Sequence, residues 1–402
     1  MTQHKDKSSL QLIISYLILN ISTGIVGGAM ILAVPCYALS LMASTAQIGL
    51  IRGMAGLGII LVVIPAGFLV DHFGTKKLYL FGACLGALTT LSLLLVRVPD
   101  FMILIMGLAG LFQSLKMTAL NASFYSDVQR IGIEKSGWFK GSISIGLTFI
   151  GPVLGGFLVD QLSFRWVFGI LAALTLIPIS LVWVFHENKK ALHTDDGLIN
   201  SLKRQLDNFK SIIGNRKLYL PVVTESLSTG CFSLYATFIV VLAVQTLQLP
   251  TTVTSTLLTA EGTLFIVTVF AAGSLLKKIS QFNMYLIGIV LAVAALFMLA
   301  ASSTFAALMA GSVVLGIGTG LMNLITAARL AQFEGEKGKI VALFSLAVGT
   351  GISIGPMLGG YVATLFGGRA SFLAFVPLFV LLLVYAWFEL HPGVKVKQAQ
   401  NA

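Results

Sequence analysis

The chain has 402 residues, of which 57% are hydrophobic and only 10% are charged, and its mean hydropathy is +0.95. Because a soluble domain carries roughly a quarter charged residues, this composition excludes an ordinary water-soluble protein. The net charge of +11 does not indicate a nucleic-acid-binding surface, because the Lys and Arg residues lie in short connectors between long apolar segments.

The first half of the sequence contains six apolar segments. Each is long enough for a membrane-spanning helix, which needs about 20 residues. The first four lie near residues 10–39, 47–70, 78–96 and 101–125. A charged connector leads into the fifth segment, and the sixth ends near Phe185.

The composition changes between His186 and Lys217, where Lys, Arg, Asp and Asn are frequent. The few apolar residues of this stretch have a partly helical spacing, which is typical of an amphipathic helix at a membrane surface. Six further apolar segments follow, near residues 218–247, 252–276, 283–302, 305–328, 340–366 and 370–390.

We therefore predict an all-α integral membrane protein with about twelve transmembrane helices in two pseudo-symmetric bundles. The first six-helix bundle is expected over residues 1–185, a cytoplasmic linker over 186–217, and the second six-helix bundle over 218–402. Most Lys and Arg residues fall on one side of the predicted spans, whereas the opposite side carries mainly Arg97, Arg165 and Arg369. Short cytoplasmic loops are enriched in Lys and Arg, so both termini and the linker are expected in the cytoplasm, as in a multi-pass protein of the cytoplasmic (inner) membrane.

A glycine-proline motif in the fifth apolar segment is repeated in the eleventh. The first copy comprises Gly151, Pro152, Gly155 and Gly156, and the second comprises Gly355, Pro356, Gly359 and Gly360. Proline inside a helix removes a backbone hydrogen bond and bends the helix. The glycines share a helical face and allow a neighbouring backbone to approach closely. The repeat indicates a duplicated membrane protein.

A second motif, Gly67-Phe-Leu-Val-Asp71-His-Phe-Gly74-Thr-Lys76-Lys77, joins the predicted second and third spans. Together the two motifs resemble those of the major facilitator superfamily, and the resemblance covers essentially the whole chain. The glycine-proline motif is similar to the fifth-helix motif of its proton-coupled antiporters and drug exporters. The resemblance implies two bundles that rock between inward-open and outward-open states. It implies conformational roles for Gly67, Asp71, Gly74, Lys76, Lys77, Gly151, Pro152, Gly155, Gly156, Gly355 and Pro356.

Four ionisable residues are expected inside apolar spans: Arg52, Lys116, Glu225 and Glu261. Such residues cost roughly 2.5–3.5 kcal/mol on insertion scales, so they commonly face a cavity or a partner. The two basic residues lie in the first half and the two acidic residues in the second. A cavity between the halves would therefore have cations on one wall and carboxylates on the other. We predict that Arg52, Lys116, Gln113 and Glu261 bind the substrate.

Simpler alternatives stay open for three of these residues. Lys116 could extend to the membrane surface or pair with a helix end, Arg52 could lie at the outer interface, and Glu225 could pair with the linker. Glu261, and after it Glu225, are the predicted proton carriers, because a carboxyl group in apolar surroundings can exchange protons near neutral pH.

The predicted function is secondary active transport, in which an exporter exchanges a small polar or amphipathic organic solute for protons by alternating access. One alternative is an importer or facilitator of an anionic or zwitterionic metabolite on the same fold. Another is a membrane-embedded enzyme or lipid-handling protein, which would need a nucleophile or metal-ligand cluster that the sequence does not show. We expect no enzyme activity, cofactor, metal or nucleic-acid partner. The expected partners are a small-molecule substrate, protons and the lipid bilayer, and the chain is expected to be a monomer.

Overall fold

The computed structural model describes residues 2–63, 65–132, 136–185, 218–273, 278–331 and 337–390. These residues form helices joined by short turns, and the described ranges contain no strand. Twelve of the helical segments are long and apolar enough to cross a membrane. The predicted all-α membrane fold is therefore confirmed. The predicted linker helix within residues 186–217 lies outside the described residues.

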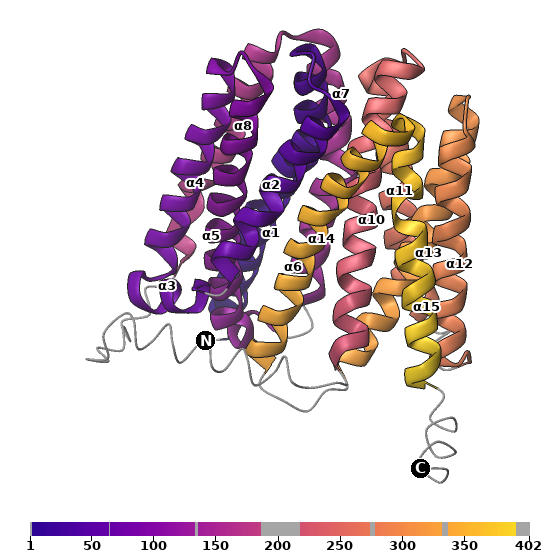
Figure 1. Cartoon of the computed structure of the whole chain (residues 1–402). Coiled ribbons are helices and arrows are strands. Elements are labelled where there is room, and N and C mark those ends of the chain that lie inside the picture. Colours follow the sequence, from indigo (N-terminus) through magenta and orange to yellow (C-terminus); the bar gives the residue numbers. More distant parts are fainter. Residues whose placement is uncertain are drawn as a thin grey trace.

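The first six spans occupy one side of the molecule (Figure 1). They are α1 (Thr2–Ser40), α2 (Thr45–Val63), α4 (Thr75–Ser92) with η1 (Leu93–Leu95), α5 (Pro99–Ile131), α6 (Ser136–Ser144) with η3 (Ile145–Ile150) and α7 (Gly151–Gln161), and α8 (Phe164–Leu176) with η4 (Ile177–Val184). The second apolar segment ends earlier than expected, because Pro65 separates α2 from the short helix α3 (Ala66–Phe73).

The last six spans occupy the other side (Figure 1). They are α10 (Tyr219–Val241) with η6 (Leu242–Thr246), α11 (Thr251–Ala271), α12 (Gln281–Ala301), α13 (Phe305–Ala331), α14 (Lys337–Phe366), and η8 (Gly368–Phe375) with α15 (Val376–Leu390). The start of α1 and the end of α15 lie at the same end of the bundle, the end that also holds α3 (Figure 1). We call residues 2–185 the first half and residues 218–390 the second half.

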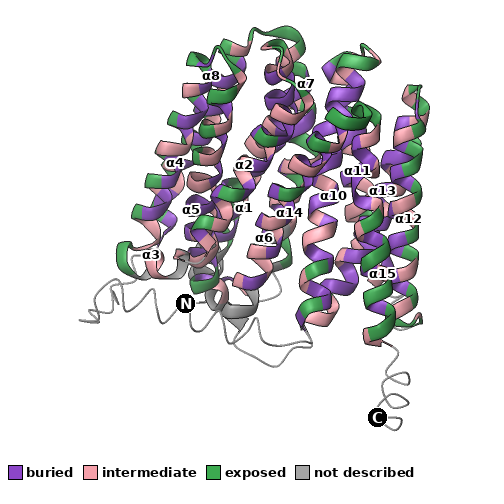
Figure 2. Cartoon of the chain, viewed as in Figure 1, coloured by how far each residue is buried: buried purple, intermediate pink, exposed green. Residues whose placement is uncertain are grey.

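Many large apolar side chains are exposed on the outside of the bundle. Leu95 is 82% exposed, Phe270 76% and Phe366 75%. Figure 2 shows that the buried residues concentrate where helices face one another, while exposed residues recur along the outward faces. Such an extensive apolar outer surface fits contact with lipid chains rather than water.

The repeated glycine-proline motif marks a close helix crossing in each half. In the first half, a Cβ added to Gly151 would lie 2.7 Å from the Cα of Gly28 on α1. In the second half, a Cβ on Gly355 would overlap the carbonyl oxygen of Gly230 on α10. Only glycine allows backbones to approach so closely. The two copies of the motif therefore perform the same packing role.

The helix that carries Gly151 is irregular just before the motif. Residues Ile145–Ile150 form the π-helical segment η3, and the Gly151 N–H donates to the carbonyl of Gly146, five residues earlier. A π-helical turn is a common cause of a local change in helix direction. Pro152 follows in the first turn of α7, and because η3 runs directly into α7 its missing N–H interrupts the backbone hydrogen bonds of a continuous helix.

The most extensive contacts between the two halves are those of α2 with α14 and of α7 with α11. In the first pair, a Cβ on Gly53 would lie 2.5 Å from the Ser353 carbonyl oxygen, and one on Gly56 would lie 2.7 Å from the Gly349 carbonyl oxygen. In the second pair, a Cβ on Gly156 would lie 2.8 Å from the Thr251 carbonyl oxygen. Glycines thus bring the backbones of the two halves into direct contact.

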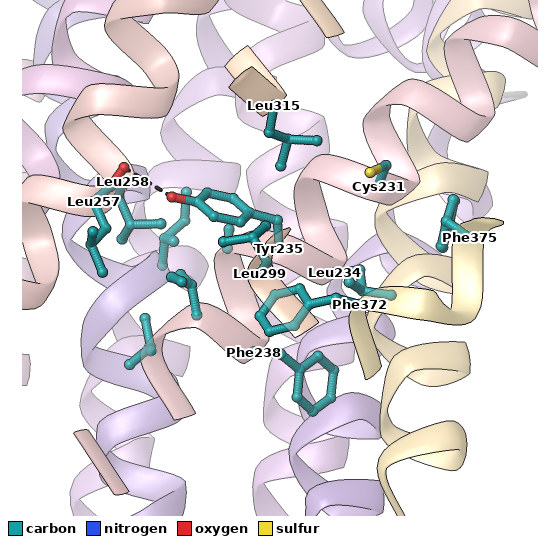
Figure 3. Close-up of a cluster of buried hydrophobic side chains, with 14 of the residues drawn as sticks. Cys231, Leu234, Tyr235, Phe238, Leu257, Leu258, Leu299, Leu315, Phe372 and Phe375 are labelled. Atoms are coloured by element: carbon teal, nitrogen blue, oxygen red, sulfur yellow. Dashed lines mark hydrogen bonds between the residues drawn. The ribbon is translucent and has the colours of Figure 1, made fainter. Parts of the chain in front are cut away.

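A cluster of aromatic and aliphatic side chains fixes α10 inside the second half (Figure 3). Phe238, Phe372 and Phe375 are almost completely buried in it. The Tyr235 hydroxyl donates to the Leu257 carbonyl oxygen on α11 at 2.9 Å and lies 2.8 Å from Ser312 Oγ on α13. This contact aligns α10, α11 and α13 at a level close to the polar residues described next.

Candidate functional site

A cavity of about 440 Å³ lies between the two halves. Its walls are formed by α1, α2, α4, α5, η3 and α8 of the first half, with Ser144 from the end of α6, and by α10, α11, α13 and α14 of the second. Most of the cavity surface is apolar, with contributions from Met30, Met106, Phe232 and Phe265, although almost half of the lining side chains are polar or charged. The size and apolar character fit a small organic ligand, since such pockets measure roughly 300–1,000 Å³.

Four residues predicted from the sequence line this cavity. Arg52 and Gln113 come from the first half, and Glu225 and Glu261 come from the second. Lys116 does not lie among the described lining residues. It is 2% exposed and sits one turn beyond Gln113 on α5, where its backbone packs against Gly82 of α4.

Glu225 has a partner for each carboxylate oxygen. Thr229, one turn later on α10, donates to Oε1 at 3.3 Å, and the Asn323 side chain on α13 donates to Oε2 at 3.2 Å. The residue is 4% exposed. Both partners also line the cavity. Two neutral donors therefore hold the carboxylate in place without cancelling its charge.

Glu261 is more deeply enclosed and less well bonded. It is 1% exposed, and among the described residues only the Thr319 hydroxyl approaches its carboxyl group, at 3.5 Å from Oε1. That hydroxyl lies closer to the Leu315 carbonyl oxygen, at 2.9 Å, and Oε2 has no hydrogen-bond partner in the described part of the chain. The backbone of α13 approaches it closely, because a Cβ on Gly316 would overlap the Glu261 carbonyl oxygen. On the next residue, a Cβ on Gly262 would lie 2.5 Å from Thr148 of the first half. Glu261 thus sits where the second half meets the first.

Arg52 supplies the positive charge of the cavity. Its Nε atom is buried and has no hydrogen-bond partner among the described residues. Among the described residues no ion pair joins Arg52 to Glu225 or Glu261. Gly49, Gly53 and Gly56 place the surrounding part of α2 directly against α14. The cavity therefore contains a cation from one half and two carboxyl groups from the other, with no direct pairing between them.

Sequence reasoning did not identify the side chains that hold the carboxylates. Thr229, Thr319 and Asn323 are polar residues within apolar spans, and only their sequence distance from Glu225 or Glu261 could have been used. A helical spacing of four links Thr229 to Glu225, which is a detectable signal. Asn323 belongs to a different span, so its contact with Glu225 depends on tertiary packing.

Asp160, the acidic residue of α7, links the two halves at one end of their contact. The N–H groups of Thr251 and Thr252 donate to its carboxylate at 3.0 and 2.8 Å, and the Thr251 hydroxyl lies 2.5 Å from Oδ1. Asp160 therefore caps the N-terminus of α11 from the opposite half, where a negative charge is favoured. At the same end Thr45 Oγ1 lies 3.2 Å from Thr364 Oγ1.

These contacts lie at the end of the bundle away from the start of α1 and the end of α15 (Figure 1). In the part of the chain that the structure describes, the side-chain hydrogen bonds between the halves are all found there. The structure is therefore closed at the end that holds Asp160.

We expect Asp160→Ala to loosen this end. A hydrogen bond to a charged group contributes about 1.5–3 kcal/mol. Loss of one such bond is enough to raise the population of a form in which the two halves separate at this end roughly tenfold. Spin labels at Ser40 and Gln245, both exposed near this end, would report the change as a longer and broader distance distribution. The exposed Cys84 would first be replaced by Ser.

Asp100→Ala is the matched control for this measurement. Asp100 is exposed at the same end, but its carboxylate accepts a hydrogen bond from Gln47 of its own half, at 2.8 Å. Its replacement should leave the distance between the labels unchanged. If Asp160→Ala gave the same distribution as Asp100→Ala, Asp160 would not be what holds the two halves together.

The turn motif is placed at the opposite end, between α3 and α4. Gly74 has a φ angle of +80°, which explains why glycine is needed at this turn. Gly67 and Asp71 belong to α3, and the contacts predicted for the Asp71 side chain lie outside what the structure describes. Lys76 and Lys77 lie in the first turn of α4.

Comparison with known proteins gives consistent matches over the whole chain. The model of the Major Facilitator Superfamily matches residues 12–300 and 223–402. The inner membrane transport protein YajR of Escherichia coli is 25% identical over 347 residues, which cover 83% of this chain and 72% of YajR. The multidrug resistance protein MdtG of Dickeya zeae is 25% identical over 336 residues, which cover 81% and 79% of the two chains. The crystal structure of the nucleoside transporter NupG superposes with a TM-score of 0.76 over 94% of this chain and 98% of NupG, at 15% identity.

Proposed function

Because this chain belongs to the Major Facilitator Superfamily and is a membrane transporter rather than an enzyme, we propose that it is a secondary active exporter. It exchanges a small polar or amphipathic organic solute for protons by alternating access. The observation that carries this proposal is the cavity between the halves, which takes ionisable side chains from both of them. A site formed in this way changes its access when one half rocks against the other.

Glu261 is the proposed proton carrier. Proton exchange needs a carboxyl group that the transported solute can influence, and Glu261 lines the same cavity as Arg52 and Gln113. In the part of the chain that the structure describes, its Oε2 atom has no hydrogen-bond partner. A buried carboxylate without adequate partners is costly, so a proton bound there lowers the free energy of the empty cavity.

The direction of transport is proposed from orientation and relatives. The Lys and Arg distribution favours cytoplasmic termini in the cytoplasmic membrane. The end held by Asp160 then faces outward, but importers and exporters both pass through a state closed at that end, so orientation alone does not set the direction. MdtG is described as a multidrug resistance protein, which supports export here. The glycine-proline and turn motifs are proposed to guide the rocking motion, in which each half moves as a unit. The chain is proposed to act as a monomer.

The test uses purified protein in liposomes that contain a pH-sensitive dye and experience an imposed pH gradient. Amphipathic drugs, amino-acid-like chelators and organic acids are added one at a time. We expect at least one of them to cause proton movement that protein-free liposomes do not show. Solute flux that is the same with and without the pH gradient would contradict the exchange mechanism and identify a facilitator.

A further inference from the structure

The two acidic residues of the cavity are bonded differently, and this difference indicates different tasks. Glu225 has a neutral donor at 3.3 Å on one oxygen and another at 3.2 Å on the other. Glu261 has one contact of 3.5 Å and an oxygen without a partner. Glu225 is therefore oriented with its charge available to a ligand, whereas Glu261 is suited to hold a proton.

The cation on the facing half is also available. Arg52 lines the cavity, its buried Nε has no partner, and no described acidic side chain forms an ion pair with it. A guanidinium group binds carboxylates and phosphates with good geometry. A ligand with an anionic group would accept hydrogen bonds from the Arg52 guanidinium group.

Apolar side chains line the same cavity as the two charged groups. Met30 and Met106 contribute to the wall of the first half, and Phe232 and Phe265 contribute to the wall of the second. Methionine adapts to irregular shapes and aromatic rings provide large apolar contact areas. The ligand body that fits this surface is hydrophobic.

We propose that the cavity binds an amphipathic zwitterion, with its anionic group at Arg52, its cationic group at Glu225 and its apolar body between them. This proposal rests on the proposed function, because it takes the cavity as the transport site. It departs from the sequence-based prediction by giving Glu225 to the substrate and leaving proton exchange to Glu261 alone.

The charges of the cavity disfavour the other ligand classes. A lipophilic cation would leave Arg52 unpaired beside a second positive charge. A simple anion would satisfy Arg52 but would leave Glu225 without a cation. Buried charges that lack a partner are costly, so a zwitterion should bind more tightly than either singly charged analogue of the same size.

Direct binding to the purified protein tests this without any transport assay. The probes are the dipeptide phenylalanyl-phenylalanine, its N-acetyl form, its amide, and the form blocked at both ends. All four share one apolar body and differ mainly in the charges at its two ends. We expect calorimetry to show that the free dipeptide binds at least tenfold more tightly than each of the other three.

Two variants identify the residue that recognises each charge. In Arg52→Gln the dipeptide and its amide should bind equally, because the carboxylate no longer has a partner. In Glu225→Gln the dipeptide and its N-acetyl form should bind equally. Arg97→Gln removes a positive charge from an exposed turn outside the cavity, and it should keep the preference of the unmodified protein.

Three results would overturn the proposal: equal or tighter binding of a singly charged or neutral form, no binding of any probe, or unchanged selectivity in both cavity variants. The comparison of the four probes on the unmodified protein remains decisive even if a variant does not fold. Proton movement driven by other solutes in liposomes would still support the proposed function, so failure of the two ideas can be distinguished.

Discussion

Replacing Glu261 by Gln is expected to abolish proton movement coupled to solute transport. Glutamine keeps the size of the side chain and can still accept a hydrogen bond from Thr319. It cannot bind and release a proton near neutral pH. We expect a loss of at least about a hundredfold in solute-driven proton flux, comparable with the loss of a group that transfers protons elsewhere. The dye-filled liposomes described above measure this directly.

Exchange of labelled for unlabelled solute across the same liposomes should survive in Glu261→Gln, because it needs alternating access but no net proton transfer. Glu389→Gln is the control. Glu389 is also an acidic residue of a membrane-spanning helix, but it lies outside the cavity lining and pairs with Arg329 at 2.6 Å. Proton flux that persists in Glu261→Gln at the level of this control would exclude Glu261 as the carrier.

Gly28→Ala is expected to destabilise the first half strongly. The added Cβ would lie 2.8 Å from Pro152 Cδ and 2.9 Å from the Cα of Gly151, and it would overlap the Leu147 carbonyl oxygen. Backbone atoms cannot move aside as side chains do, so the helices must separate. Overpacking of this kind costs about 1–3 kcal/mol. Because the unfolding entropy of a chain of this length is large, the midpoint of thermal unfolding in detergent should fall by roughly 1–4 °C.

Gly141→Ala provides the comparison on α6, where nothing lies within 4 Å of the added Cβ. Alanine favours a helix more than glycine does, so stability should stay the same or rise slightly. If the two variants unfolded at the same temperature, the approach of α1 to α7 would not contribute to stability in the way described.

The sequence was sufficient to predict the spans because apolar length and connector charge are local properties. The sequence also predicted that a neighbouring backbone would approach Gly151 closely, because the spacing of the glycines places them on one helical face. Its partner Gly28 was not identified, because nothing local in α1 specifies which helix it will meet. Pro65 shows the opposite case, in which a local signal for a helix break was present and the predicted span nevertheless continued past it.

The site was predictable in part for the same reason. Arg52, Glu225 and Glu261 stood out because ionisable residues are rare in apolar spans, and the structure places all three on one cavity. Lys116 carried the same signal, yet it lies on a part of α5 that packs against Gly82. Position within an apolar span does not tell an ionisable residue that lines the cavity from one, such as Lys116, that packs between helices. The roles of Asn323 and Asp160 depend on contacts between distant helices, for which one sequence contains no direct information.

The glycine-lined contact between α2 and α14 affects how fast the halves can move against each other. Where helices interlock through large side chains, sliding requires many rotamers to change together, and each change adds to an activation barrier. At Gly53 and Gly56 the backbone of one half instead lies directly on the backbone of the other. Few side chains must rearrange there during a relative rotation. This contact is therefore suited to rapid turnover, with the rate limited by the hydrogen bonds at the Asp160 end rather than by rearrangement of side chains along the contact.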